Sequence, residues 1–272
     1  MIDGRVTRYW EYPAGTNATA TIIFVHGYRG NHRGLEAIAG ALPTCHVLIP
    51  DLPGFGGSEA FQGPHSIESY SKWLKGFVSL TSPNATVLGH SFGTIVVAAA
   101  AATGLTNPLV LVNPVARYGY SVSKRVMQRF VDTFYLLCER LPERLGSALC
   151  SSPLFVRLMS EVLAKTKDSA LRKWIHQQHA DNFSDFSSVR VAVEGYRASV
   201  SASVSDFATR IGQSVLLIAS DLDDITPISS TKRLAAELTN AELEVLKDVG
   251  HLVHYERPKE AARLIEEFCR QH

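Results

Sequence analysis

Short apolar runs of strand length recur along the chain, and segments with apolar residues at helical spacing separate most of them. These runs lie at residues 20–25, 46–50, 85–89, 109–113, 214–219 and 243–246. Runs that are apolar on both faces and alternate with helices are typical of a parallel sheet covered on both sides. The early segment RVTRYWEY instead alternates apolar and polar residues, as antiparallel edge strands do. The pattern predicts an α/β fold: a mostly parallel sheet with helices on both faces.

One long interval interrupts this alternation. From Val115 to about Gln213 the sequence has helical patterns and no convincing strand, and the alternation of strands and helices resumes afterwards. A block of this length is about the size of a small domain. We therefore expect a core domain made of residues 1–114 and 214–272, with a helical cap of residues 115–213 inserted between two strands of the sheet.

The composition excludes several classes of partner. Lys plus Arg number 27 against 26 for Asp plus Glu, so no large field would attract nucleic acid or an anionic membrane. The longest apolar run, residues 95–102, is far shorter than the roughly 20 residues needed to cross a bilayer. The four cysteines are far apart and form no CxxC pair, which predicts free thiols. We expect a soluble, cytoplasmic protein that acts on a small molecule; its oligomeric state stays open.

The stretch VLGHSFGTIVV carries the first candidate chemistry. Here Ser91 lies between Gly89 and Gly93 in a G-x-S-x-G motif, after the apolar run 85–88 and before the helical run 92–102. This is the context of a nucleophile elbow, a sharp strand-to-helix turn that exposes a serine hydroxyl above the sheet. The helix N-terminus also directs backbone N–H groups toward developing negative charge. The context predicts that Ser91 is a nucleophile.

A serine nucleophile needs a base, and the base needs an orienting acid. The chain contains GHSFG, then SDLDDITP, then VGHLVHYERP, with VHGYRG and DLPGFGGS upstream. In these motifs, and in the order nucleophile, acid, histidine, it resembles the α/β-hydrolase superfamily, as a capped serine hydrolase of the esterase or C–C hydrolase type. The resemblance covers nearly the whole chain, is weakest in the helical insertion, and carries little information about the substrate.

The resemblance assigns the base to His251. This residue follows Gly250, which permits a tight turn, and precedes the closing helical segment that starts at Pro258. The family's equivalent position is a Gly-His pair in this loop. His254 is the main rival, and we expect it to pack or to be solvated.

The acid lies among Asp221, Asp223 and Asp224, which all follow the apolar run 214–219. The family commonly places its acid four residues before a proline, and counting back from Pro227 selects Asp223. Asp224 is the second choice, and we expect it to point elsewhere, for example as a helix cap. The acid would hold the imidazole tautomer and stabilise the imidazolium.

Backbone N–H groups are the expected oxyanion donors. One belongs to Phe92, directly after the nucleophile, and the resemblance places the other at Tyr28 in VHGYRG. Arg29 is a candidate partner for a substrate carboxylate or, alternatively, a surface residue. The full set of candidate substrate contacts is Arg29, Asn113, Arg117, Trp174 and Phe183.

No cofactor and no metal are expected. The G-x-G-G in DLPGFGGS is not followed directly by a helix, as a dinucleotide fingerprint would require, and no Walker or HExxH motif occurs. His176 and His179 are three residues apart, but no further ligand stands nearby in the sequence. A solvated helix face is therefore the preferred interpretation of this pair.

Three functions fit these residues. The first is hydrolysis of a carboxylester through an acyl-enzyme on Ser91. The second uses the same triad on other bonds, as in C–C bond hydrolases, amidases, lactonases and lyases of menaquinone synthesis. The third, from a different class, is a non-catalytic ligand receptor that keeps the triad residues.

Overall fold

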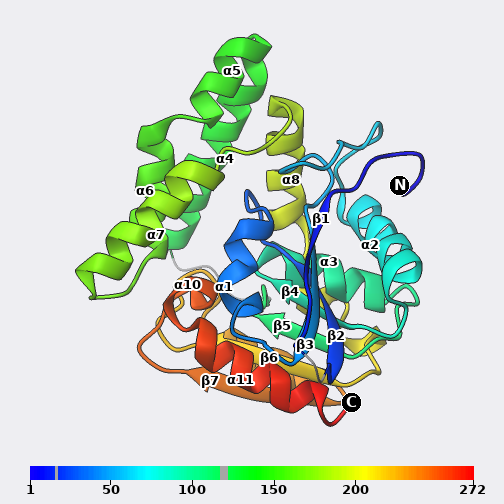
Figure 1. Cartoon of the computed structure of the whole chain (residues 1–272). Helices are drawn as coiled ribbons and strands as arrows, with labels where there is room; N and C mark the ends of the chain where they lie inside the picture. Colours follow the sequence, from blue (N-terminus) through cyan, green and yellow to red (C-terminus); the bar gives the residue numbers. More distant parts are fainter. Residues whose placement is uncertain (16–17, 117–121) are drawn as a thin grey trace.

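The computed structural model describes residues 1–15, 18–116 and 122–272. Within these ranges the core is a seven-stranded sheet in the order β1-β3-β2-β4-β5-β6-β7 (Figure 1). β1 pairs antiparallel with β3, and the other neighbouring strands are parallel. The strands are β1 (Tyr9–Tyr12), β2 (Ala20–Val25), β3 (Cys45–Pro50), β4 (Thr86–His90), β5 (Leu109–Val112), β6 (Val215–Ser220) and β7 (Ala241–Leu246). The predicted α/β fold class is confirmed.

Helices cover both faces of the sheet. The apolar side chains of β2 alternate between two separate cores: Ile22 and Phe24 pack on one face, Ile23 and Val25 on the other. This is why residues 22–25, the fully buried part of the strand, are all apolar. On the first face lie η1 (His32–Leu35), α1 (Glu36–Ala39), α10 (Val253–Glu256) and α11 (Pro258–Cys269), and on the second α2 (Ile67–Thr81), α3 (Phe92–Ala101), η2 (Val204–Asp206), η3 (Ala208–Arg210) and α9 (Ile228–Glu237).

Helix α2 illustrates how the local sequence sets these elements. Its N-cap is Ser66, whose hydroxyl accepts from the backbone N–H of Ser69. From there Tyr70, Leu74 and Phe77 recur at helical spacing and are buried against the sheet. The amphipathic pattern thus determines which side of the helix faces the core.

Between β5 and β6 the described part of the chain forms five α-helices in addition to η2 and η3, and these five lie together to one side of the core (Figure 1). They are α4 (Val122–Arg140), α5 (Glu143–Cys150), α6 (Pro153–Leu163), α7 (Ser169–Asn182) and α8 (Val189–Ser201). Their own small core packs around Tyr135, Cys138 and Tyr196. Across the residues that the structure describes, no helix is both long and apolar enough to cross a membrane.

Candidate active site

Ser91 lies in the sharp turn between β4 and α3. Its φ of 52° is in the left-handed region that residues with a side chain rarely adopt. Its N–H donates to the carbonyl oxygen of Val112 on β5 at 3.0 Å, and the hydroxyl of Thr94 donates to the Ser91 carbonyl oxygen at 2.6 Å. These bonds hold the strained turn at the carboxyl end of β4.

The two glycines of the motif are required by close approach of the backbone. A Cβ at Gly93 would lie 2.2 Å from the carbonyl oxygen of Val25, and one at Gly89 would lie 2.5 Å from the carbonyl oxygen of Gly93. Gly27, in the loop after β2, approaches from the other side, where a Cβ would lie 3.3 Å from the Cβ of Ser91. The turn and the loop after β2 are therefore packed against each other around the serine.

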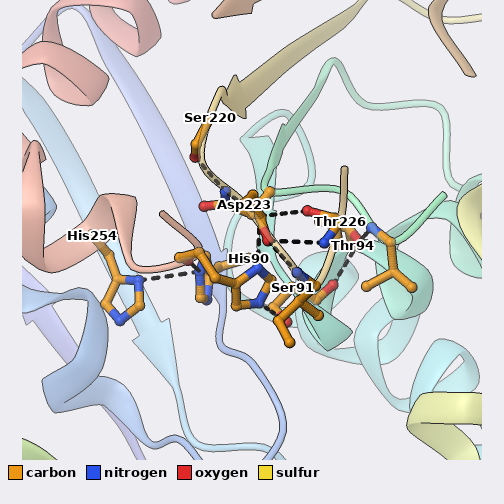
Figure 2. A network of polar contacts seen from close by, with 11 residues as sticks. His90, Ser91, Thr94, Ser220, Asp223, Thr226 and His254 are labelled. Atoms are coloured by element: carbon orange, nitrogen blue, oxygen red, sulfur yellow. Dashed lines mark hydrogen bonds and ion pairs between the residues drawn. The ribbon is translucent and has the colours of Figure 1, made fainter. Parts of the chain in front are cut away.

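A chain of hydrogen bonds joins Ser91, His251 and Asp223, within the polar network of Figure 2. The Ser91 Oγ lies 2.8 Å from His251 Nε2, and His251 Nδ1 lies 2.8 Å from Asp223 Oδ2. Because Nδ1 faces an ionised carboxylate, it carries the ring proton, and Nε2 presents its lone pair to the serine hydroxyl. His251 follows β7 and Asp223 follows β6, so the carboxyl ends of parallel strands bring the three residues together.

Asp223 is held as an anion by its surroundings. Burial opposes its ionisation, but the interaction with His251 and hydrogen bonds from Thr226 outweigh burial and lower the Asp223 pKa to about 2. Oδ1 accepts from the N–H groups of Ile225 and Thr226, both at 2.8 Å, and Oδ2 accepts from the Thr226 hydroxyl at 2.5 Å. The loop thus supplies fixed donors that orient the carboxylate toward His251.

Asn113 lies behind the acid and does not line the pocket described below, as a substrate contact would. It is fully buried, and its Nδ2 donates to Asp223 Oδ2 at 2.9 Å and to Ser220 Oγ at 2.7 Å. Its position at the carboxyl end of β5 placed it among the candidates, but the strand end points its amide at the neighbouring loop after β6. Its Oδ1 is one of the buried atoms without a partner among the described residues.

The rival acid Asp224 and the rival histidine have other partners. Asp224 forms an ion pair with Lys165 at 2.6 Å and does not cap α9, whose N-cap is Pro227. His254 is buried, with Nδ1 3.1 Å from His90 Nε2. Burial lowers the pKa of His90 to about 3 and that of His254 well below its ordinary value, so both rings are neutral.

The two expected oxyanion donors lie beside the serine. Tyr28 and Phe92 line the same pocket as Ser91, and within the described residues no hydrogen bond uses either backbone N–H. Sequence analysis missed the role of His26, although it adjoins Gly27 in VHGYRG. Its Nε2 accepts from Leu52 N–H at 2.9 Å, so Nδ1 carries the proton and donates to the Gly27 carbonyl oxygen at 2.8 Å. That bond fixes the peptide plane whose N–H belongs to Tyr28.

The serine opens into a cavity of about 590 Å³ between the core and the inserted helices. A volume of this size is typical of small-molecule sites. Its walls are mostly apolar and come from both parts of the chain, with His90, Ser91 and His251 on the core side. The apolar residues from the insertion are Val115, Ala116, Val131, Tyr135, Phe155, Met159, Leu163, Phe183, Tyr196, Val200 and Ala202.

Arg29 borders this cavity but is neither a surface residue nor free for a carboxylate. It is 3% exposed, and its donors go to the carbonyl oxygens of Phe183 and Cys150 at 2.8 Å and to the hydroxyl of Tyr135 at 3.1 Å. Phe183 lines the cavity, as expected of a substrate contact. Trp174 does not line it; this ring is 41% exposed and packs edge-on against Tyr255. Arg117 lies outside the described residues.

His176 and His179 are buried, so the expectation of a solvated helix face was wrong. Both Nδ1 atoms contact the buried hydroxyl of Ser160 on the facing helix α6, at 2.6 Å for His176 and 2.8 Å for His179. The exposed side of α7 carries Lys173 and Gln177 instead. Among the described residues no group of three or more side chains could hold a metal ion.

A parallel sheet with a strained serine turn, a histidine loop and an acid loop at the carboxyl ends of its strands defines the α/β-hydrolase class. The model of the alpha/beta hydrolase family matches residues 22–264, and the chain belongs to that family. It is an enzyme, a hydrolase of this fold. The fold and family predictions made from the motifs are confirmed.

Two relatives and one solved structure illustrate what the chain is similar to. The uncharacterized hydrolase YugF of Bacillus subtilis (strain 168) is 25% identical over 99% of this chain and 96% of its own length. Monoacylglycerol lipase ABHD6 of Rattus norvegicus is 24% identical over 91% of this chain and 74% of its own length. An esterase from Exiguobacterium antarcticum matches in structure with a TM-score of 0.79 at 15% identity, covering 98% of this chain and 97% of that one.

Proposed function

We propose that the protein is a serine hydrolase that cleaves a carboxylester through an acyl-enzyme. The observation that carries this proposal is the hydrogen-bonded chain from Ser91 through His251 to Asp223, with the serine exposed to an apolar cavity. Serine is a poor nucleophile without an aligned base, and the 2.8 Å contact to Nε2 supplies that base.

In the proposed reaction Ser91 Oγ attacks the ester carbonyl while His251 Nε2 accepts the hydroxyl proton. The N–H groups of Tyr28 and Phe92 stabilise the oxyanion, a contribution of about 3–4 kcal/mol per donor in comparable enzymes. His251 then protonates the leaving alcohol. Water enters, His251 removes its proton, and hydrolysis of the acyl-enzyme releases the acid and restores Ser91. Asp223 stabilises the imidazolium throughout and does not take the proton.

The walls of the cavity support a neutral, largely apolar ester. Burying each CH₂ of an acyl chain contributes about 0.8 kcal/mol, which favours substrates with several carbons beyond the carbonyl. C–C hydrolases and lyases that act on carboxylated substrates need free cationic donors. Among the cavity-lining residues that the structure describes, Arg29 is the one arginine, and its donors already face carbonyl and hydroxyl oxygens of the insertion. The ester is therefore the better-supported substrate class.

We also propose that residues 115–213 act as the cap that encloses this ester. Side chains of the inserted helices form much of the cavity wall, and Arg29 ties α5 and the end of α7 to the oxyanion loop.

The test is covalent labelling by a fluorophosphonate together with hydrolysis of p-nitrophenyl esters of increasing acyl length. We expect labelling and turnover in the native protein, with neither in Ser91→Ala. A native protein that is neither labelled nor active on any of these esters would refute the proposal and favour the ligand receptor. Labelling without ester turnover would indicate that the same three residues cleave another kind of bond, such as an amide or a C–C bond.

A further inference from the structure

A second chain of polar side chains runs through the inserted helices, separate from Ser91, His251 and Asp223. It joins Glu161 and Ser160 on α6 to His176 and His179 on α7. Glu161 lies at the surface, where it pairs with Arg157 and Arg172 at 2.6 and 2.7 Å. At the other end, His179 lines the cavity that Ser91 opens into. The chain therefore connects a surface ion-pair cluster to the wall of the proposed substrate cavity.

The serine in the middle of this chain couples the two histidines. A hydroxyl donates one hydrogen bond, so Ser160 can donate to the Nδ1 of only one of the two rings. The other ring must carry its proton on Nδ1 and donate to the Ser160 oxygen. The tautomers of His176 and His179 are therefore linked, and fixing one of them fixes the other.

The position of Glu161 favours one of the two tautomer arrangements. Hydrogen bonds from Arg172 and Arg157 lower its pKa to about 2, so it is an anion. Its Oε1 lies 3.5 Å from His176 Nε2, longer than a hydrogen bond but close enough for the carboxylate to favour a proton on that nitrogen. His176 then accepts from the Ser160 hydroxyl at Nδ1. In consequence His179 donates from Nδ1 to the Ser160 oxygen, and its Nε2 keeps a lone pair.

The lone pair on His179 Nε2 lies at the end of the hydrogen-bonded series that borders the cavity. Among the described residues no hydrogen bond uses Nε2 of His179, while its ring packs against Phe183 and Tyr255. Burial lowers the His179 pKa to about 4, so the ring stays neutral and the nitrogen stays an acceptor at neutral pH. His179 thus presents an oriented acceptor beside the apolar ring of Phe183 in the cavity wall.

We infer that His179 is a specificity-determining residue, whose Nε2 accepts a hydrogen bond from a hydroxyl group of the ester. This inference rests on the proposed esterase function and narrows its substrate class to esters that carry a free hydroxyl away from the scissile carbonyl. The hydroxyl can sit on the alcohol part or on the acyl chain. An ester without it would leave the buried nitrogen unpaired, and sites built around such a bond discriminate against the missing group.

The test compares two matched pairs of esters. Glycerol monoesters are set against propyl esters of the same fatty acid, and methyl esters of ω-hydroxy fatty acids against their unsubstituted counterparts. In the native enzyme we expect kcat/KM to be about tenfold higher for the hydroxylated member of one pair. The pair that shows the preference identifies the part of the ester that reaches His179.

Variants then locate the preference. His179→Phe should reduce the ratio to about one, because the acceptor is lost. Glu161→Gln and Ser160→Ala should reduce the ratio by about threefold, because they release the tautomer without altering the cavity wall. These two variants also test the inference if His179→Phe does not fold. The matched control is Gln177→Ala on the exposed side of α7, which should leave the ratio unchanged.

Two outcomes overturn the inference: a kcat/KM ratio near one for both ester pairs in the native enzyme, or a preference for the hydroxylated ester that persists in His179→Phe. The esterase proposal still stands in either case if the plain esters are hydrolysed. Failure of the esterase proposal appears differently, as no labelling and no turnover of any ester. In that case calorimetric binding of the glycerol monoester and the propyl ester to the Ser91→Ala protein decides. Tighter binding of the monoester that disappears with His179→Phe supports the inference, and equal binding refutes it.

Discussion

Arg29 and Cys150 are 121 positions apart, yet the Arg29 Nη2 donates to the Cys150 carbonyl oxygen at 2.8 Å. Arg29 directly follows Tyr28, the proposed oxyanion donor, and Cys150 ends α5 of the insertion. The guanidinium is buried and lies over the rings of Phe155, Phe183 and Phe186 at 5.4–5.7 Å. One side chain therefore links the position of the inserted helices to that of the oxyanion loop.

Replacing Arg29 should loosen both the inserted helices and the oxyanion loop. Arg29→Met keeps much of the volume but leaves the carbonyl oxygens of Phe183 and Cys150 without their donors, at a cost of about 1–3 kcal/mol of unfolding free energy. We expect a lower melting temperature and a lower kcat/KM, measured by calorimetry and by ester hydrolysis. Arg144→Met, at an exposed position of α5, is the control. Unchanged stability and activity in Arg29→Met would contradict this account of the contact.

The acid assignment gives a sharper pair of variants. Asp223→Asn removes the charge that holds the His251 tautomer, and kcat should fall by about 10⁴-fold. Asp224→Asn breaks a mostly exposed ion pair with Lys165 and should leave kcat within about twofold. Steady-state kinetics on one p-nitrophenyl ester distinguish the two. A large loss confined to Asp224→Asn would reverse the assignment.

Asn113 should act through Asp223 and not through the substrate. Asn113→Ala removes the 2.9 Å bond to Oδ2 and leaves Ser220 without its amide partner, so we expect kcat to fall by about tenfold with KM nearly unchanged. A substrate contact would instead raise KM for some esters and not for others. Kinetics across an acyl-length series provide the measurement, and a KM effect that depends on the ester would contradict the positioning role.

The fold and the candidate triad of Ser91, Asp223 and His251 could both be predicted from the sequence. The run 20–25 coincides with β2, whose last four residues are all apolar because both faces of the strand are buried there. Ser91, Asp223 and His251 each follow a parallel strand, and the carboxyl ends of such strands meet at one edge. The family resemblance selected Asp223 and His251, and the meeting of the strand ends explains why these residues lie next to Ser91.

The side-chain contacts of the inserted helices could not be predicted from the sequence in this way. The burial of His176 and His179 depends on Ser160, which lies on a separate helix, and the partners of Arg29 lie more than 100 residues away along the chain. No local pattern encodes which faces of α6 and α7 meet. These contacts follow from the packing of α6 against α7. The same packing orients His179 Nε2, the proposed acceptor for a substrate hydroxyl.

Two buried histidines beside the serine make stability depend on pH. The pKa of His90 is lowered by burial from 6.5 to about 3, and that of His254 lies well below its ordinary value for the same reason. The unfolded chain therefore binds protons near pH 6.5, before the folded protein does. Their contribution to stability is complete above pH 6.5 and is lost as the pH falls toward the folded pKa values.

Between pH 7.5 and 5.5 we expect the unfolding free energy to fall by about 1.3 kcal/mol for each of these two rings. Urea unfolding at several pH values measures the slope. His90→Asn, which removes one titrating ring, should show a shallower slope even if its overall stability is lower, whereas Gln177→Ala on the exposed side of α7 should keep the native slope. A slope that is unchanged in His90→Asn would mean that His90 is already protonated in the folded protein, contrary to its burial beside His254.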